Sequence, residues 1–117
     1  MDFERAKALC RTFPGATEDI KWGEDLVFSV GEKMFAVTRD SSPASGMSFK
    51  VEDERFLELT DRPGIIPAPY LARAKWIYIE QPDALGDDEA GALLRRSYEL
   101  VFAKLTKKLQ REISESA

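Results

Sequence analysis

The sequence contains no histidine and a single cysteine, and both shortages narrow the functions open to it. Without imidazole, the Ser-His-Asp and Cys-His arrangements that activate nucleophiles are excluded, as are most zinc sites. The one thiol, Cys10, has no partner for an internal disulfide, which fits a reducing compartment. We therefore expect a cytoplasmic protein.

Long apolar runs, glycine-rich phosphate loops and a secretory start are also missing. No segment approaches the ~18 consecutive apolar residues of a membrane span. The chain has no P-loop, no Gly-x-Gly-x-x-Gly, no Gly-x-Ser-x-Gly and no metal-ligand spacing. Residues 1–5 lack the basic start of a signal peptide. We expect neither catalytic activity nor a cofactor.

An excess of positive charge is missing too, because 17 Lys and Arg stand against 21 Asp and Glu, for a net charge of −4. This balance does not favour nucleic acid over the molecule as a whole, since phosphate neutralisation supplies most non-specific affinity. The basic residues are nevertheless concentrated in residues 95–111, which hold six Lys and Arg against one Glu. The local distribution of charge therefore matters more than its sum.

The chain is long enough for one self-sufficient domain over residues 1–117. Its first segment predicts an amphipathic helix that Asp2 caps and that Pro14 and Gly15 end. The apolar positions of this helix, spaced by three and four residues, include Cys10. We interpret Cys10 as a buried packing thiol rather than a nucleophile.

Alternating apolar residues predict strands over much of the rest. After a weak strand over residues 17–22, two strong strands at 26–30 and 33–38 flank the two-residue loop Gly31-Glu32, which predicts a hairpin. A longer and mobile loop, Arg39 to Gly46, leads into a further strand over residues 47–51.

Two prolines predict an edge strand. Pro67 and Pro69 remove two N–H groups from the same side of their segment, so that side cannot pair. The alternation over residues 76–80 predicts a central strand with Ile77 and Ile79 on one side and Trp76 on the other.

Two further helices complete the pattern. Asp53 caps a short helix that reaches Thr60, and Asp87 starts the last helix. If that helix continues straight through Thr106, four cations form a stripe beside the apolar one; alternatively, Thr106 caps a new short helix. The four are Lys104, Lys107, Lys108 and Arg111. The fold class is α+β: a single antiparallel sheet with an N-terminal helix, a short middle helix and a long C-terminal helical segment.

Several segments, taken in this order, resemble the MmcQ/YjbR family of small bacterial proteins. They are Phe13-Pro14-Gly15-Ala16, residues 28–36 (Phe-Ser-Val-Gly-Glu-Lys-Met-Phe-Ala), residues 48–51 (Ser-Phe-Lys-Val), residues 63–71 (Pro-Gly-Ile-Ile-Pro-Ala-Pro-Tyr-Leu), residues 75–79 (Lys-Trp-Ile-Tyr-Ile) and residues 97–108. The resemblance implies a CyaY-like fold, described for this family as a double-wing DNA-binding motif with loops off the sheet as wings. The chain has Lys75 where the family often has His, and Thr106 where members have Pro.

The first hypothesis is a nucleic-acid-binding domain that contacts the phosphate backbone. Lys33 lies at the first hairpin tip, Arg39 and Lys50 beside the second loop, and Trp76 offers a stacking surface. The alternative for each is a solvated charge or a packed ring. The full set is Lys33, Arg39, Lys50, Arg73, Lys75, Trp76, Lys104, Lys107 and Lys108. We expect the protein to be a monomer and its partner to be DNA.

A second hypothesis is a non-catalytic protein- or small-ligand-binding module that uses exposed aromatic side chains on the sheet face. Its candidate residues are Trp22, Tyr70, Trp76 and Tyr78. The CyaY likeness also raises iron binding through acidic ridges. The first helix offers only Asp2 and Glu4, interleaved with basic residues, so we expect no metal site.

Overall fold

The computed structural model describes the backbone of residues 1–39 and 46–116 and the side chains of residues 1–38 and 46–115. The described strands are β1 (Ala16–Lys21), β2 (Asp25–Val30), β3 (Lys33–Arg39), β4 (Met47–Lys50), β5 (Ile65–Pro67) and β6 (Trp76–Ile79). They form one sheet in the order β1-β2-β3-β4-β6-β5, and all neighbours are antiparallel.

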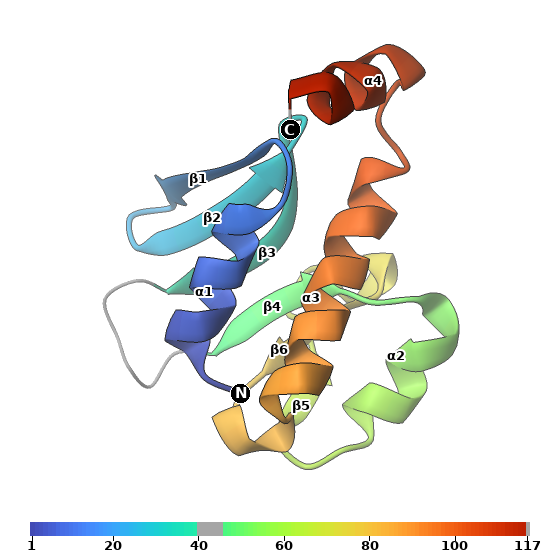
Figure 1. Ribbon diagram of the computed structural model, residues 1–117. Helices are drawn as coiled ribbons and strands as arrows, with labels where there is room; N and C mark the ends of the chain where they lie inside the picture. Colours follow the sequence, from blue (N-terminus) through green and yellow to red (C-terminus); the bar gives the residue numbers. More distant parts are fainter. Residues whose placement is uncertain (40–45, 117) are drawn as a thin grey trace.

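Four α-helices accompany the sheet within the described residues: α1 (Phe3–Thr12), α2 (Asp53–Thr60), α3 (Asp87–Phe102) and α4 (Lys107–Ser116). Two short 3₁₀ turns, η1 (Ala72–Ala74) and η2 (Pro82–Ala84), flank β6. Helices α1 and α3 lie side by side over one face of the sheet, and α4 crosses beyond the end of α3 (Figure 1). The predicted α+β class is confirmed.

The local signals for α1 and for the first hairpin are confirmed. The Asp2 carboxylate accepts hydrogen bonds from the backbone N–H groups of Glu4 (2.9 Å) and Arg5 (3.2 Å), which makes it the N-cap of α1. In the β2–β3 loop, Gly31 and Glu32 have φ values of +57° and +68°, as a two-residue hairpin loop requires.

The proline-marked segment forms the edge of the sheet, as predicted, since β5 pairs only with β6 and ends at Pro67. Strand β6 has neighbours on both sides, β4 and β5, and lies one strand in from that edge. Ile77 and Ile79 are fully buried in the core beneath the helices.

Asp53 does not cap α2. The helix begins at Asp53 itself, Glu52 occupies the N-cap position, and no side chain there caps the helix. The Glu52 carboxylate instead accepts a hydrogen bond from the Arg96 guanidinium of α3 at 3.0 Å. The acidic first turn still suits the positive end of a helix dipole.

The C-terminal helical segment breaks, which decides between the two alternatives for Thr106. Its side-chain oxygen accepts a hydrogen bond from the N–H of Leu109 at 3.2 Å, and its carbonyl accepts one from Gln110 at 2.9 Å. Thr106 therefore caps α4. Lys104 is left in the turn between α3 and α4, so the basic stripe is not continuous.

Candidate nucleic-acid interface

Most of the predicted basic residues lie at one end of the sheet. Strand β3 begins at Lys33, and the antiparallel β4 ends at Lys50. Lys50 lies opposite Trp76, the first residue of β6, so Lys75 is at the same end. Lys104 arrives there from α3. This end, called the basic end below, comprises Lys33, Lys50, Arg73, Lys75, Lys104, Lys107 and Lys108.

Lys50 is held in place through Ser97, a fully buried residue of α3. The Ser97 hydroxyl accepts a hydrogen bond from the Lys50 backbone N–H at 3.0 Å and donates one to the Phe35 carbonyl at 2.7 Å. The Lys50 ammonium group donates a hydrogen bond to the carbonyl of Ala74. One hydroxyl therefore links α3 to both β3 and β4 where Lys50 emerges.

Lys75 follows η1 in a left-handed conformation, with φ at +64°. Its N–H closes the η1 turn on the Ala72 carbonyl at 3.0 Å, and its own carbonyl accepts the Val51 N–H at 2.9 Å. The ammonium nitrogen lies 5.2 Å from the centre of the Phe56 ring, a cation–π contact. This contact keeps a positive charge beside the end of β4.

Lys50, Lys75 and Lys104 are called the lysine cluster below, and the charges of the other two act on Lys50. Burial lowers the pKa of Lys50 most, the positive charge of Lys104 comes second, Asp53 opposes the shift, and Lys75 adds to it. Like charges brought together in this way disfavour the charged form. Three elements far apart in sequence thus deliver cations to one place.

The arginines behave differently, because most of those described are paired with carboxylates. The pairs include Arg5 with Asp87 (3.2 Å), Arg11 with Glu18 (2.9 Å) and Arg96 with Glu52 (3.0 Å). In contrast, no carboxylate lies within 4.0 Å of the ammonium group of Lys50, Lys75 or Lys104 anywhere in the described part of the chain. The cations that remain available to a ligand are therefore chiefly lysines.

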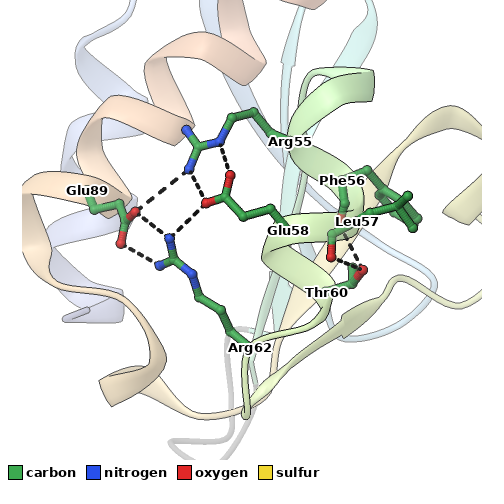
Figure 2. Close-up of polar contacts among 7 residues, drawn as sticks. All are labelled: Arg55, Phe56, Leu57, Glu58, Thr60, Arg62 and Glu89. Carbon is green, nitrogen blue, oxygen red and sulfur yellow. Dashed lines mark hydrogen bonds and ion pairs between the residues drawn. The ribbon is translucent and has the colours of Figure 1, made fainter.

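The largest set of paired arginines joins α2 to the start of α3 (Figure 2). Arg62 donates to both carboxylate oxygens of Glu89, at 2.7 and 3.0 Å, and to Glu58 at 3.1 Å, while Arg55 donates twice to Glu58 at 3.0 Å. These bonds lower the pKa of Glu58 and of Glu89. The network is a surface clamp between two helices, and its two arginines are not free for phosphate.

Two of the predicted positions need correction. Lys50 does not lie beside the second loop, because Met47 adjoins that loop and Lys50 ends the strand about 10 Å further on. The backbone of Arg39 ends β3 at the opposite end from Lys33, and its side chain lies outside the described residues. The β2–β3 loop and the end of β3 therefore lie at opposite ends of the sheet.

Trp76 does not provide a stacking surface in this fold. It is only 5% exposed at the start of β6, the strand between β4 and β5. Lys33, Arg73, Lys104, Lys107 and Lys108 are all exposed. The cationic part of the predicted set is thus accessible where its side chains are described, and the aromatic part is not.

The four rings of the alternative hypothesis do not form one surface. Trp22 and Tyr70 are 70% and 103% exposed, but Trp22 adjoins the edge strand β1 and Tyr70 follows the opposite edge strand, β5. Tyr78 is partly buried, and its hydroxyl accepts a hydrogen bond from the Gly46 N–H at 3.0 Å. With Trp76 buried, no aromatic patch on the sheet face results.

The single thiol of the chain lies in the core. Cys10 is fully buried, and burial raises the pKa of its thiol to about 12, as expected for a packing residue. Within residues 1–39 and 46–116, no three acidic or thiol side chains gather as metal ligands. No helix in that part of the chain is long and apolar enough to cross a membrane.

The sequence did not point to Ser97 as the residue that positions Lys50. A signal was nevertheless present, because Ser97 falls between Leu94 and Val101 on the apolar stripe of α3. A hydroxyl on such a stripe needs hydrogen-bond partners once it is buried. What the sequence cannot say is which backbone groups those partners are.

Comparison with known proteins gives a consistent result. A family model described as YjbR matches residues 11–100 of the chain. A crystal structure of a Deinococcus radiodurans protein with a domain described as DUF419 has a TM-score of 0.83 and 29% identity, covering 96% of this chain and 87% of that one. A Pseudomonas syringae protein has a TM-score of 0.69 and 21% identity, covering 86% and 99%, and this likeness shows the fold alone. No curated protein matches the chain.

Proposed function

The chain belongs to the YjbR family, and on that premise we propose that it binds nucleic acid through the phosphate backbone at its basic end. The observation that carries the proposal is the convergence of Lys50, Lys75 and Lys104, with no ion pair to a carboxylate among the described residues. A polyanion placed there relieves the repulsion that the folded chain imposes on these cations.

The type of cation supports backbone contacts over base reading. Lysine is a compact point charge suited to phosphate, whereas arginine makes the bidentate contacts that distinguish bases in the major groove. The arginines that face carboxylates, such as Arg62 and Arg96, are occupied in the protein's own network. Binding with little sequence preference is the expected consequence.

The acidity of the whole molecule does not oppose this proposal. At physiological salt, charges farther apart than about 8 Å are largely screened, so a phosphate at the basic end interacts mainly with its nearest neighbours. Two exposed acids, Glu32 and Asp53, belong to those neighbours, and they moderate the local charge without pairing to the lysine cluster. We propose a cytoplasmic, monomeric and non-catalytic protein in this role.

The test is a salt-titrated binding measurement. Fluorescence anisotropy with labelled duplex and single-stranded oligonucleotides would compare the unmodified protein with Lys75→Gln and Lys104→Gln. Each substitution should reduce the slope of log K against log [salt] by about 0.7–0.9, the share of one phosphate contact. The matched control is Lys21→Gln, which removes the same charge from the end of β1, away from the basic end.

Binding should be strongest at low salt, and Lys21→Gln should change it much less than Lys104→Gln does. An absence of binding at low salt, or equal losses in all three variants, would refute the proposal.

A further inference from the structure

A groove beside the basic end is lined by an aromatic ring and polar side chains as well as by cations. It lies between the end of α3 and α4, has a volume of about 390 Å³, and is open to solvent. Its lining residues are Phe102, Lys107, Gln110, Arg111 and Ser114.

The side chains of α4 that line the groove share one face of the helix. Lys107, Gln110, Arg111 and Ser114 are spaced by three, four and seven residues, which brings them into a row. Phe102, the last residue of α3, lies across from this row. Two helices therefore present an aromatic ring on one side and two cations on the other.

The position of α4 beside the groove is fixed by packing and by hydrogen bonds. Its apolar residues pack over two glycine turns: a Cβ on Gly31 would lie 2.9 Å from the Leu109 side chain, and one on Gly15 would lie 2.8 Å from Ile113. Inside the groove, the Gln110 amide nitrogen donates to the carbonyls of Leu105 (2.9 Å) and Ala103 (3.3 Å). The turn between α3 and α4 is thereby fixed.

The aromatic side of the groove is a stacked pair. The Phe102 ring is partly buried and lies 5.8 Å from the Tyr98 ring at an interplanar angle of 26°. Tyr98 is itself buried and donates a hydrogen bond to the Pro14 carbonyl at 2.5 Å. Phe102 is thus a partly exposed ring on a rigid support, which is what a stacking platform for a base requires.

The cations on the other side of the groove form no ion pairs with the described residues. Lys107 and Arg111 are exposed, and no carboxylate of the described residues lies within 4.0 Å of either side-chain charge. The side-chain carbonyl of Gln110 accepts no hydrogen bond within the same residues, so it can accept one from a base edge. An aromatic ring, two cations and an amide oxygen together match a base with its flanking phosphates.

We propose that this groove receives one unpaired base of a single-stranded nucleic acid, stacked on Phe102, with its flanking phosphates on Lys107 and Arg111. The inference rests on the proposed function, since Lys104 leads from the lysine cluster to the groove. A duplex keeps its bases stacked on one another and offers no free base face, so the groove favours single strands.

The experiment compares three ligands of equal phosphate number: a single strand, an abasic strand and a duplex. Anisotropy is measured at low salt for the unmodified protein, for Phe102→Leu, which keeps an apolar side chain against Tyr98, and for the control Trp22→Leu. Trp22 is an exposed aromatic residue in the β1–β2 turn, away from the groove. Thermal melting of each variant verifies that it folds.

The unmodified protein should bind the single strand at least about fivefold more tightly than the abasic strand. Phe102→Leu should abolish that difference and leave duplex affinity unchanged, while Trp22→Leu should alter neither. If affinity follows phosphate number alone, or if Phe102→Leu weakens all three ligands equally, the base site is refuted and backbone binding stands. If no ligand binds at low salt, the proposed function fails with it.

Discussion

Gly31 lies directly beneath Leu105: a Cβ on the glycine would come within 2.7 Å of the leucine Cδ2 atom. This contact brings the tip of the first hairpin against the turn that carries Lys104. A glycine at this position satisfies two requirements at once, because the loop needs a φ of +57° and the helix needs the space.

Gly31→Ala should therefore destabilise the protein by more than its conformation alone requires. A left-handed residue with a side chain costs about 1–2 kcal/mol, and the crowding against Leu105 adds about 1–3 kcal/mol. Gly23→Ala is the matched control, since Gly23 has a φ of +88° but no atom within 4 Å of the added Cβ. The free energies of unfolding of the two variants in urea should differ by the cost of crowding against Leu105. Equal losses would show that α4 does not rest on the hairpin.

Ser97→Ala should reveal how much the buried hydroxyl contributes. The substitution leaves the Lys50 N–H and the Phe35 carbonyl without their partner, which costs about 2–4 kcal/mol in the free energy of unfolding. Ser48→Ala, a change of the same size at a partly exposed position of β4, should stay within about 0.5 kcal/mol of the unmodified protein. A cost for Ser97→Ala below that of the control would contradict the assignment.

Lys104→Gln should stabilise the folded chain slightly while weakening nucleic-acid binding. The positive charge of Lys104 lowers the pKa of Lys50, so removing it relieves a repulsion of the order of 0.2–0.5 kcal/mol. Unfolding in urea measures the gain, and anisotropy measures the lost affinity. A gain in stability together with a loss of affinity would indicate that Lys104 belongs to a binding site. A loss of both stability and affinity would indicate that Lys104 has a structural role.

The lowered pKa of Lys50 also sets a direction with pH. Between that lowered value and its ordinary 10.5, the unfolded chain binds more protons at this residue than the folded chain does. The Lys50 contribution to stability therefore rises with pH across this window. In Lys104→Gln the rise should be smaller, and unfolding measurements at several alkaline pH values would show whether it is.

The clamp between α2 and α3 should respond to acid. The Arg62 guanidinium lowers the pKa of Glu89, so its stabilisation is fully present above the ordinary carboxyl pKa of 4.5 and is lost as the pH falls through the lower folded value. Glu89→Gln should cost at most about 1 kcal/mol at neutral pH, because the pair is partly exposed. The difference from the unmodified protein should vanish in strong acid. A difference that persists there would show that the clamp is not ionic.

Much of the fold is predictable from local sequence signals. Gly31-Glu32 predicts a two-residue hairpin because glycine readily adopts the positive φ that the loop needs, and Pro67 predicts an edge because proline has no N–H to donate to a neighbouring strand. Where two outcomes were close in energy the sequence could not choose. Thr106 either continues a helix or caps a new one, and the packing of Leu109 and Ile113 over two glycine turns favours the cap.

The candidate site is harder to predict from the sequence, because it depends on which strand ends lie together at one end of the sheet. In the sequence, Arg39 and Lys50 lie on either side of the same loop. Antiparallel pairing of β3 and β4 nevertheless places them at opposite ends of the sheet. Trp76 alternates with core residues and was assigned to the outer side, but its surroundings bury it. Helical spacing can predict part of the arginine network, such as the pair Arg55–Glu58, but the pair Arg62–Glu89 forms only because α2 packs against α3.

The two borders of the sheet have a further consequence. At one border, Pro67 interrupts the row of donors that an incoming strand would need; at the other, β1 carries Glu18, Asp19 and Lys21, whose hydration any incoming strand would have to displace. Strand-to-strand pairing between copies of the protein is therefore disfavoured at both borders of the sheet.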